Sequence, residues 1–501
     1  MPPQAVKKLI INSTIAETRI GLIEGDRLAE IYVERHHKRG MVGNIYKAKV
    51  SRVLPGMQSA FVDIGAERSA FLYGGDVVDF ELSPPVKEHD SDPRENSNRI
   101  PIEKILKEGQ EITVQVAKEP LGSKGPRVTM VATIPGRYLV LMPEFNSLGI
   151  SRRIESEALR QSLLSEVEAM RPAEMGVIIR TAALEAQAGQ LQKDLAYLLK
   201  VWESVQARRA KCSAPALLYQ EPDLVLKTTR DLYSEDVAEI VVDDPQVYDQ
   251  LLHFLQDSIP AAPDKLKLYQ GKDLIFDHYG LEMEIARALA RKVWLASGGY
   301  LVIDQTEALT SFDVNTGKYV GSSNAQDTIL KTNLEAIDEV VHQLRIRNLG
   351  GIIVIDFIDM ESFADQRRVN EGLLEALKFD KSRTNVLAIN ELGLVQMTRK
   401  RTRESLERVV TVDCGHCQGW GRVHSRESLA YELVRDIERF YLRTGQHVIR
   451  VRIRDDVLDM LMHEERPLFN VLQEKYALEL IFEKTHLQSL MLKDDPYEVI
   501  G

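Results

Sequence analysis

Apolar and polar residues alternate along the first part of the chain in the way that half-buried β-strands require. Residues 18–24 and 27–34 both show this alternation, and the Gly25-Asp26 pair between them suits a two-residue turn, so a β-hairpin is predicted. Further short strands, punctuated by glycines, follow over residues 43–73, and strand character resumes at 111–117. This succession of short strands predicts a small β-barrel.

A polar stretch with four prolines, residues 79–101, interrupts the barrel pattern and is expected to form a long exposed loop. Beyond the barrel, residues 127–142 and 176–182 have strand character. Residues 155–170 and 184–210 instead have the spacing of helices. This part of the chain is therefore expected to mix strands and helices.

Strand and helix patterns alternate again over residues 234–277. Ile285, Leu289 and Val293 then recur every four residues, which predicts a helix over 281–295. Two strands are expected next, at 300–303 and 309–314, joined by a turn at 305–307.

The strongest helical pattern of the chain covers residues 325–346, where six apolar residues share one face. The run GGIIVID that follows, residues 350–356, is rich in β-branched residues and predicts a fully buried strand. Helices and strands alternate to about residue 405. Residues 424–501 predict a small α+β domain.

The composition narrows the class of protein. Of the 501 residues 44% are hydrophobic and 28% charged, which are ordinary values for globular domains. There is no long apolar run and no signal-peptide pattern at the N-terminus, so no membrane association is expected. Only three cysteines occur, which excludes a disulfide framework and favours the cytoplasm. The net charge of −11 does not exclude a nucleic acid partner, because local basic surface decides contact.

Two aspartates stand at the ends of predicted strands, Asp313 before Val-Asn-Thr-Gly and Asp356 after the apolar run. Carboxylates at such positions need a partner, and Mg²⁺ prefers oxygen ligands of this kind. Asn315 lies on the same side of its strand as Asp313 and is placed to orient a phosphate or a water. The alternative is that these aspartates cap helices or fill turns, which is the commoner role for such residues. Asp359 is a weaker third candidate.

Two further patterns suggest binding sites. Phe61 and Phe71 lie in the predicted barrel among basic residues, and aromatic platforms with cations suit single-stranded nucleic acid. The alternative is that both rings belong to the barrel core. Cys414 and Cys417 form a C-x-x-C pair, which supplies half of a four-ligand zinc site. One alternative is that Cys212 and His416 complete the site within one chain, although neither has diagnostic spacing. A thioredoxin-like redox pair is the competing interpretation. The remaining solution is a site to which two chains give two cysteines each.

Several phrases of the sequence, taken together and in order over roughly residues 10–425, resemble the ribonuclease E/G family. They are GNIYKAKVSRVLPGMQSAFVDIGAERSAFL, GRYLVLMP, GISRRI, IIRTAA, TEALTSFDVNTG, TNLEAIDEVVHQLRIRNLGGIIVIDFIDM and DCGHCQGWG. With this resemblance the metal interpretation of Asp313 and Asp356 replaces the capping one.

The resemblance implies a multidomain fold of α+β and α/β type. Its parts are an RNase H-like domain split between 1–38 and 226–288, an inserted S1 barrel of OB type at 39–124, a 5′-sensor region at 125–225, a DNase I-like catalytic domain at 289–410, a zinc link at 411–423 and a small domain at 424–501.

The resemblance also assigns roles to individual residues. Those expected to be catalytic are Asp313, Asn315 and Asp356, the two aspartates as ligands of Mg²⁺. Those expected to bind a 5′-phosphate are Gly136, Val140, Arg180 and Thr181. Those expected to contact RNA from the S1 barrel are Phe61, Phe71, Lys118 and Lys124. Those expected to share a structural Zn²⁺ between chains are Cys414 and Cys417.

The implied activity is that of a cytoplasmic, Mg²⁺-dependent endoribonuclease that cuts single-stranded RNA and leaves 5′-phosphate and 3′-hydroxyl ends. A substrate 5′-monophosphate is expected to stimulate it, and rRNA precursors and mRNA are the expected substrates. The zinc link implies a homodimer or a dimer of dimers, although Gly415 replaces the proline usual in the family. Assembly through the long scaffold tail of larger family members is not expected. The rival interpretation is a non-catalytic RNA-binding protein of S1 type, which would be insensitive to chelators.

Overall fold

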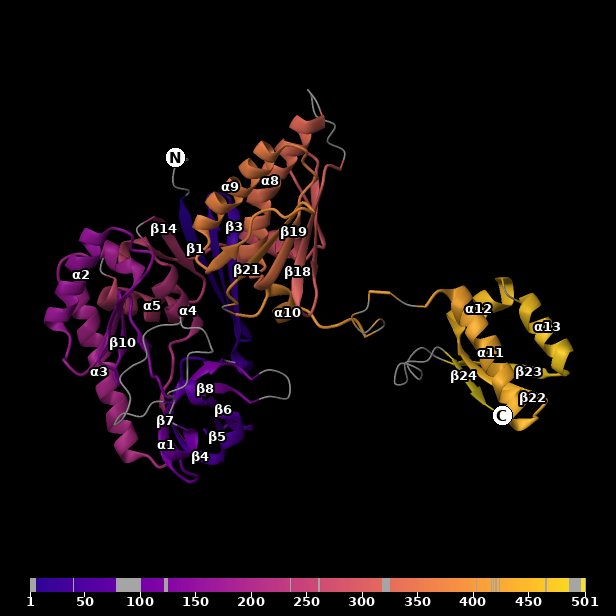
Figure 1. Cartoon of the computed structure of the whole chain (residues 1–501), viewed down its shortest axis with the longest axis horizontal. Coiled ribbons are helices and arrows are strands. Elements are labelled where there is room, and N and C mark those ends of the chain that lie inside the picture. Colours follow the sequence, from indigo (N-terminus) through magenta and orange to yellow (C-terminus); the bar gives the residue numbers. More distant parts are fainter. Residues whose placement is uncertain are drawn as a thin grey trace. The chain divides into compact units, whose positions relative to one another are not determined.

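The computed structural model (Figure 1) divides into two compact units, residues 1–409 and 410–501. It describes residues 6–38, 40–77, 101–120, 125–234, 236–259, 262–317, 325–401, 403–415, 417, 419, 421–422, 424–464, 466–485 and 497–500. The predicted loop at 79–101 thus lies, except for its last residue, outside the described residues, as do Lys124 and His416. None of the described helices has the length and apolar character needed to cross a bilayer.

The first sheet is assembled from two distant parts of the chain. The predicted hairpin is confirmed and forms two of its strands, while the strand before the hairpin pairs in parallel with a strand some 230 residues later. Leu9, Ile10 and Ile11 are fully buried at this junction. The strand order is β15(Leu266–Leu268), β14(Val237–Val242), β1(Lys7–Ser13), β2(Glu17–Glu24) and β3(Arg27–Arg35). The associated helices are α4(Leu224–Leu232), α5(Pro245–Ser258), α6(Ile275–His278) and α7(Leu281–Ala288). A relationship to the RNase H fold stays a prediction.

The predicted small barrel is confirmed as a closed five-stranded sheet with an OB-like form. Its strands follow one another in the order β4(Ile45–Leu54), β5(Ser59–Asp63), β6(Ala70–Tyr73), β8(Arg127–Thr129) and β7(Glu111–Lys118). Pairing between β7 and β4 closes the barrel. The short helix α1(Ile102–Ile105) packs against its core, and β13(Ala216–Tyr219) adds to the outer edge of β4.

A separate four-stranded sheet packs against two helices, α2(Glu157–Met170) and α3(Gln190–Lys211). Both helices were predicted, but α3 begins six residues later than expected, because a 3₁₀ turn, η4(Thr181–Glu185), precedes it and Gly189 adopts a left-handed conformation at its N-cap. The strand order is β11(Leu148–Ile150), β12(Gly176–Ile179), β10(Leu139–Met142) and β9(Ile134–Pro135).

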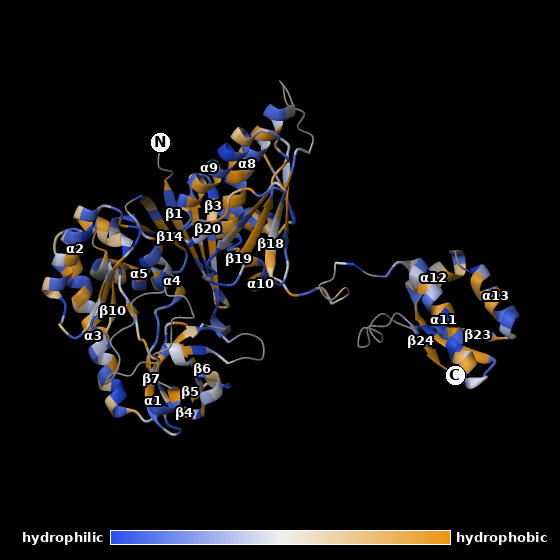
Figure 2. Cartoon of the chain, in the orientation of Figure 1, coloured by the Kyte–Doolittle hydropathy of each residue, from blue (hydrophilic) through white to orange (hydrophobic). Residues whose placement is uncertain are grey.

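The largest hydrophobic core among the described residues lies between a six-stranded sheet and two helices, α8(Ala325–Ile346) and α9(Phe363–Ala376). Both helices pack on the same face of the sheet, and α8 has the bounds predicted from its apolar stripe. Figure 2 shows the strands of this sheet largely in the hydrophobic colour and the helices with hydrophilic stretches. The strand order is β16(Lys292–Trp294), β17(Tyr300–Gln305), β18(Leu309–Asn315), β19(Gly351–Asp356), β21(Leu394–Arg399) and β20(Thr384–Val386).

Two predictions in this region are wrong. The helix expected over 281–295 ends at Ala288, and Val293 instead lies in β16, opposite Leu301 of β17. The tertiary pairing of a Lys-Val-Trp segment, well suited to an edge strand, overrides the local four-residue spacing. The strand predicted to be fully buried, β19, has only one covered face, since Ile353 and Ile355 are buried whereas Ile352 is 52% exposed. Among the described residues, helices cover one face of this sheet.

The second unit holds a small three-stranded sheet in the order β23(Glu479–Thr485), β22(Val448–Arg454), β24(Tyr497–Ile500). Strands β22 and β23 run in parallel and are connected through two helices, so they form a βαβ unit. Leu433, Ile449, Val451 and Leu461 are completely buried in its core. The helices are α11(Arg426–Thr444), α12(Asp455–Glu464) and α13(Arg466–Tyr476), and α10(Leu406–Val410) comes just before this unit.

Candidate active site

Asp313 and Asp356 lie side by side on the uncovered face of the six-stranded sheet. Strands β18 and β19 are neighbours and run in parallel, and their register pairs Asp313 directly with Asp356. Phe312 and Ile355, the preceding residues, point to the covered face and are completely buried. Because side chains alternate along a strand, both carboxylates project from the opposite face, which we call the open face.

An amide holds one of these carboxylates in place. Asn315 Nδ2 donates a hydrogen bond to Asp313 Oδ2 at 2.9 Å. The pKa of Asp356 is raised by its partial burial and by repulsion from Asp313 and Asp359. All the charged groups acting on Asp356 are thus acidic. Asp313 and Asp356 bring two carboxylates to one point of the open face, and neither forms an ion pair with a lysine or arginine among the described residues.

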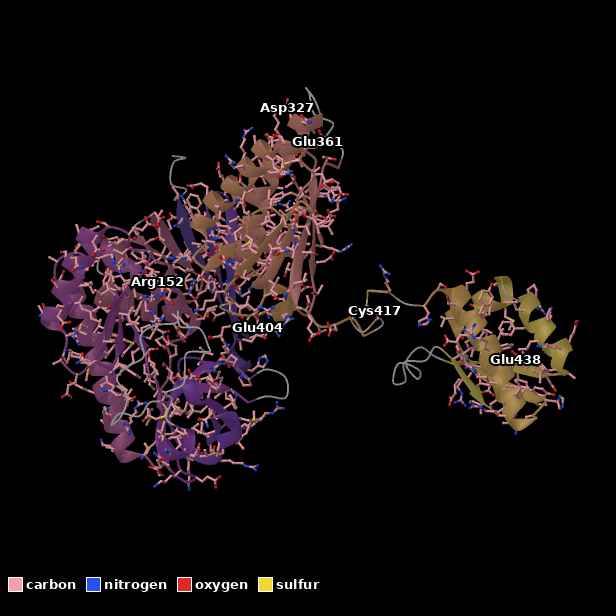
Figure 3. All side chains as sticks on the ribbon, in the orientation of Figure 1. Arg152, Asp327, Glu361, Glu404, Cys417 and Glu438 are labelled. Carbon is pink, nitrogen blue, oxygen red and sulfur yellow. The ribbon has the colours of Figure 1, made fainter. Side chains whose placement is uncertain are left out.

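The loop after β19 is fixed from beneath by Asn333 of α8. This residue is completely buried; its Nδ2 donates to the Ile358 carbonyl at 2.8 Å and its Oδ1 accepts from the Ile358 amide at 3.0 Å. Figure 3 shows Asp327, at the start of α8, and Glu361, in this loop, at the same end of the sheet. Gln326 also donates to Glu361 at 3.0 Å. Sequence reasoning missed Asn333, although a polar residue within the apolar stripe of 325–346 was a usable signal.

The alternative role of the two aspartates, helix capping, is wrong for both. Asp313 lies within β18, and the first described helix after it begins twelve residues later, at Ala325. Helix α9 is capped by Ser362, whose hydroxyl accepts from the Asp365 amide. Asp359 therefore lies before the helix and close enough to act on Asp356.

The residues on the open face fit a hard divalent cation. Within the described residues, no three His, Cys, Asp or Glu side chains gather closely enough to enclose a metal by themselves. Mg²⁺ does not need such an enclosure, because it is usually held by one or two carboxylates and keeps several waters. Two adjacent carboxylates with an orienting amide match that pattern.

The residues expected to bind a 5′-phosphate lie around the turn between β9 and β10 and the end of β12. Arg180 Nη1 donates to the Gly136 carbonyl at 2.6 Å, so the structure brings these two residues together. Thr181 follows on η4, where its hydroxyl lies 2.9 Å from that of Ser151. Val140 lies in β10, opposite Ile178. We call this group of residues the Arg180 pocket.

Two aspartates that the sequence did not reveal support the Arg180 pocket. Asp231 accepts from Arg180 Nη2 at 2.8 Å, and although burial opposes it, Arg230 and Arg180 lower the pKa of Asp231. Asp194 accepts from the backbone amides of residues 137, 138 and 139 at 2.8–3.1 Å. A Cβ at Gly136 would lie 2.6 Å from both Asp194 oxygens, so the turn requires glycine. The contacts that fix this pocket come from chain segments far apart in sequence.

Aromatic and basic residues form one row across the barrel. Phe61 and Phe71 are opposite each other on β5 and β6, with ring centroids 5.9 Å apart and an angle of 68°. Both rings are partly exposed and stand outside the buried core, so the core alternative is wrong. The row continues through paired positions on all five strands. From β4 to β7 it contains Arg52, Phe61, Phe71, Arg127 and Lys118. Arg127 was missed because only strand pairing brings it beside Phe71.

The two cysteines of the predicted zinc link form no disulfide and lie in the segment between α10 and α11, where Figure 3 labels Cys417. Cys414 is exposed and Cys417 is partly buried. The Gly421 amide donates to Cys417 Sγ at 3.3 Å, a contact that would support a thiolate ligand. A Cβ at Gly415 would meet nothing within 4 Å, so crowding does not explain the glycine at this position.

Comparison with known proteins decides the family. The profile of the Ribonuclease E/G family matches residues 133–402, which includes the open face and the Arg180 pocket. The chain belongs to the ribonuclease E/G family. A second profile, described as the RNase E/G thioredoxin-like domain, matches residues 413–492 of this family member. The βαβ unit of that region follows the cysteine pair instead of leading into it.

Individual relatives agree with this membership. The chain is 44% identical to ribonuclease G of Haemophilus influenzae over 458 residues, which cover 91% of the chain and 92% of the relative. It is 46% identical to ribonuclease G of Escherichia coli K12 over 434 residues, or 87% and 88% of the two chains. Identity to the ribonuclease E of the same strain is 36% over 94% of the chain, but this match spans 44% of the relative. This member of the ribonuclease E/G family is an endoribonuclease.

Proposed function

We propose that this endoribonuclease hydrolyses phosphodiester bonds of single-stranded RNA with Mg²⁺ held by Asp313 and Asp356. The observation that carries the proposal is the register pair of two carboxylates on the open face, with only acidic groups acting on Asp356. The family membership of the chain supports the same chemistry. The products are a 5′-phosphate and a 3′-hydroxyl.

Hydrolysis of this kind adds water across the P–O3′ bond. The water oxygen forms a new bond to phosphorus, the P–O3′ bond breaks, and the departing 3′ oxygen takes up a proton. Bound Mg²⁺ would polarise a non-bridging phosphate oxygen and lower the pKa of a coordinated water. Asn315 keeps Asp313 Oδ2 oriented, and Asn333 holds the loop after Asp356 so that the two carboxylates stay in register.

The rival function, RNA binding without catalysis, rests on the barrel alone. The row of Phe61 and Phe71 with its flanking cations suits stacking of unpaired bases and contact with phosphates. Relatives that are ribonucleases over nearly the whole chain favour the enzyme, with the barrel as its substrate-holding part.

The test is cleavage of a 5′-labelled oligoribonucleotide by the wild type and by Asp313→Asn, with Mg²⁺ and with excess chelator. We expect cleavage by the wild type with Mg²⁺ only, and RNA binding without cleavage by the variant. Asp304→Asn is a matched control, since Asp304 lies on β17 of the same sheet but pairs with Arg291 at 2.5 Å, and it should cleave normally. Cleavage in chelator, or normal turnover by Asp313→Asn, would reject the proposal.

The Arg180 pocket supports a preference for substrates with a 5′-monophosphate. A guanidinium fork beside a hydroxyl suits a terminal phosphate. Arg180 is held from two sides by Gly136 and Asp231, so its position is set before a ligand arrives. In this proposal the pocket binds the 5′ end while the open face cuts elsewhere on the strand.

Cys414 and Cys417 are proposed to bind zinc shared between two chains. Two thiolates per chain give four ligands about a two-fold axis, which makes a homodimer and permits a dimer of dimers. Metal analysis should then find one zinc per two chains, and Cys414→Ser should lower the oligomeric state measured by light scattering. One zinc per chain would point to a site within each chain. If a reduced sample contained no metal, Cys414 and Cys417 would be better explained as a redox pair.

The last part of the proposal concerns the location of the enzyme and its RNA substrates in the cell. A cytoplasmic enzyme with these features would act in maturation of rRNA precursors and in mRNA decay. Transcript ends mapped in a strain that carries Asp313→Asn should show extended rRNA precursors and longer-lived mRNA. Unchanged ends would remove this role without affecting the proposed chemistry.

A further inference from the structure

An aromatic pair with a lysine lies at the edge of the open face, outside every role assigned so far. Trp294 of β16 and Tyr300 of β17 have ring centroids 5.4 Å apart at an angle of 63°. Lys292 Nζ lies 4.2 Å from the Trp294 centroid and 3.5 Å from that of Tyr300. Trp294 is nevertheless 58% exposed. The pair therefore presents apolar ring surface to solvent.

The strand register puts this pair beside the two catalytic aspartates. Trp294, Tyr300 and Asn315 are paired across three strands. The next row on the same face holds Lys292, Val302, Asp313 and Asp356. With strands about 4.8 Å apart and alternate residues about 6.8 Å apart, the Cα atoms of Tyr300 and Asp313 are roughly 8 Å apart. That separation is within the reach of one nucleotide.

The charges around the pair favour an anionic, aromatic ligand. Lys292 rests on the rings and forms no ion pair with an acid among the described residues, although Asp313 lies in its own row. Its long side chain is free to turn toward a phosphate, which would uncover the inner ring faces. If the rings served only to cover the edge strand, they would be expected to bury most of Trp294, which they do not.

We infer that Trp294 and Tyr300 form a stacking platform for a nucleobase of the RNA strand, one nucleotide from the bond that is cut, with Lys292 contacting the adjacent phosphate. The inference rests on the proposed role of Asp313 and Asp356. Bases of every kind have a stackable face, so the platform positions the strand with little sequence preference. Trp294 is then a positioning residue that aligns the scissile phosphate with the carboxylates.

The first test is steady-state cleavage of a single-stranded oligoribonucleotide with Mg²⁺. Trp294→Ala should raise KM roughly 5- to 50-fold with a much smaller change in kcat, as expected for loss of one stacked base. Trp294→Phe should retain most of the affinity. Phe379→Ala is a matched control, because Phe379 is 70% exposed but follows α9 on the covered side of the sheet, and its KM should be unchanged.

The second test replaces single nucleotides of the oligoribonucleotide by abasic ones and measures binding to Asp313→Asn protein. One position beside the cleaved bond should weaken binding, and that sensitivity should vanish when Trp294→Ala is added. Equal KM for Trp294→Ala and wild type would overturn the inference, as would an abasic profile that Trp294→Ala leaves unchanged. Normal cleavage by Asp313→Asn alone would instead reject the proposed function, whatever the result at Trp294.

Discussion

The carboxylates of the open face and those of the Arg180 pocket differ in the partners that surround them. On the open face, partial burial and then repulsion from Asp313 and Asp359 raise the pKa of Asp356. In the Arg180 pocket, burial also raises the pKa of Asp194, but its carboxylate accepts hydrogen bonds from three backbone amides, and Asp231 is bonded to two arginines. A carboxylate whose oxygens are occupied by hydrogen-bond donors or arginines stabilises the fold. A carboxylate that lies beside other acidic groups and has no cationic partner costs stability, and it is available to bind a ligand. The difference separates residues that stabilise the fold from those proposed to perform the chemistry.

The largest effect is expected on the open face. Asp356→Asn should lower kcat by roughly 10²–10³-fold or more, because it removes one of the groups proposed to hold the charge-stabilising ion. Thermal stability should stay equal or rise, since the change relieves repulsion with Asp313 and Asp359. Cleavage assays and thermal unfolding of the same preparation measure both. A large loss of stability would show that Asp356 stabilises the fold, and the open face would then not differ from the Arg180 pocket in this respect.

The opposite result is expected in the Arg180 pocket. Asp194→Ala should lower the free energy of unfolding by roughly 3–4 kcal/mol, because three backbone amides lose their buried acceptor. Cleavage per folded molecule of a 5′-hydroxyl substrate should change little. Denaturant unfolding followed by activity of the folded fraction measures these quantities. A stable variant would mean that solvent replaces the carboxylate at this turn.

A further carboxylate, Glu339 of α8, extends the comparison to the pH dependence of stability. Burial would raise the pKa of Glu339, but hydrogen bonds from His342, Arg27 and Gln343 outweigh it and lower the pKa to about 2 from the ordinary 4.5. A lowered pKa stabilises the fold above pH 4.5, and this contribution is lost as the pH falls toward 2. It amounts to roughly 3 kcal/mol at most.

Glu339→Gln should therefore lower the unfolding temperature at pH 7, with the difference from wild type shrinking between pH 4.5 and 2. Thermal unfolding of both proteins between pH 7 and pH 2 measures this difference in unfolding temperature. The exposed Asp304 pair with Arg291 provides the control, because exposed ion pairs contribute little, and Asp304→Asn should differ only slightly from wild type at every pH. A pH-independent difference for Glu339→Gln would attribute its effect to packing.

The smallest effect is expected on substrate selection. Arg180→Ala should remove a preference for 5′-monophosphate that we expect to be roughly tenfold or more, the size of a lost charge-assisted contact. Cleavage of a matched 5′-hydroxyl substrate should stay nearly unchanged. Rates on the two substrates, measured side by side, give the ratio. An equal loss on both would mean that Arg180 supports the fold or the chemistry instead of sensing the 5′ end.

The sequence predicted helices and strands well where the pattern of apolar residues was long and each element formed through contacts between residues close in sequence. The apolar stripe of 325–346 gave α8 its bounds, and the alternation around Gly25-Asp26 gave the first hairpin. It failed at Val293, which fits both a helix period and an edge strand, so that only pairing with Leu301 decides. It also failed at Ile352, because an apolar run does not reveal whether one or two layers cover a sheet.

The candidate site was predictable only in part for a related reason. Asp313 and Asp356 attracted attention as strand ends, but their adjacency depends on a register between strands about forty residues apart. Asp194, Asp231 and Arg127 act through contacts that cross sheets and chain segments, and no local signal marks them. Whether a carboxylate has hydrogen-bond and ion-pair partners depends on the folded structure and is not visible in the local sequence.

The first sheet has a consequence for synthesis of the protein on the ribosome. Strands β1, β2 and β3 emerge first and are able to pair at once, but the other edge of β1 awaits β14, which begins at Val237. At roughly 5–20 residues per second, that partner follows some 10–50 seconds later. During this interval a strand containing Leu9, Ile10 and Ile11 presents an unpaired edge, while the barrel can already fold. The nascent chain is thus most exposed to mispairing with other chains before the six-stranded sheet that carries the open face has been made.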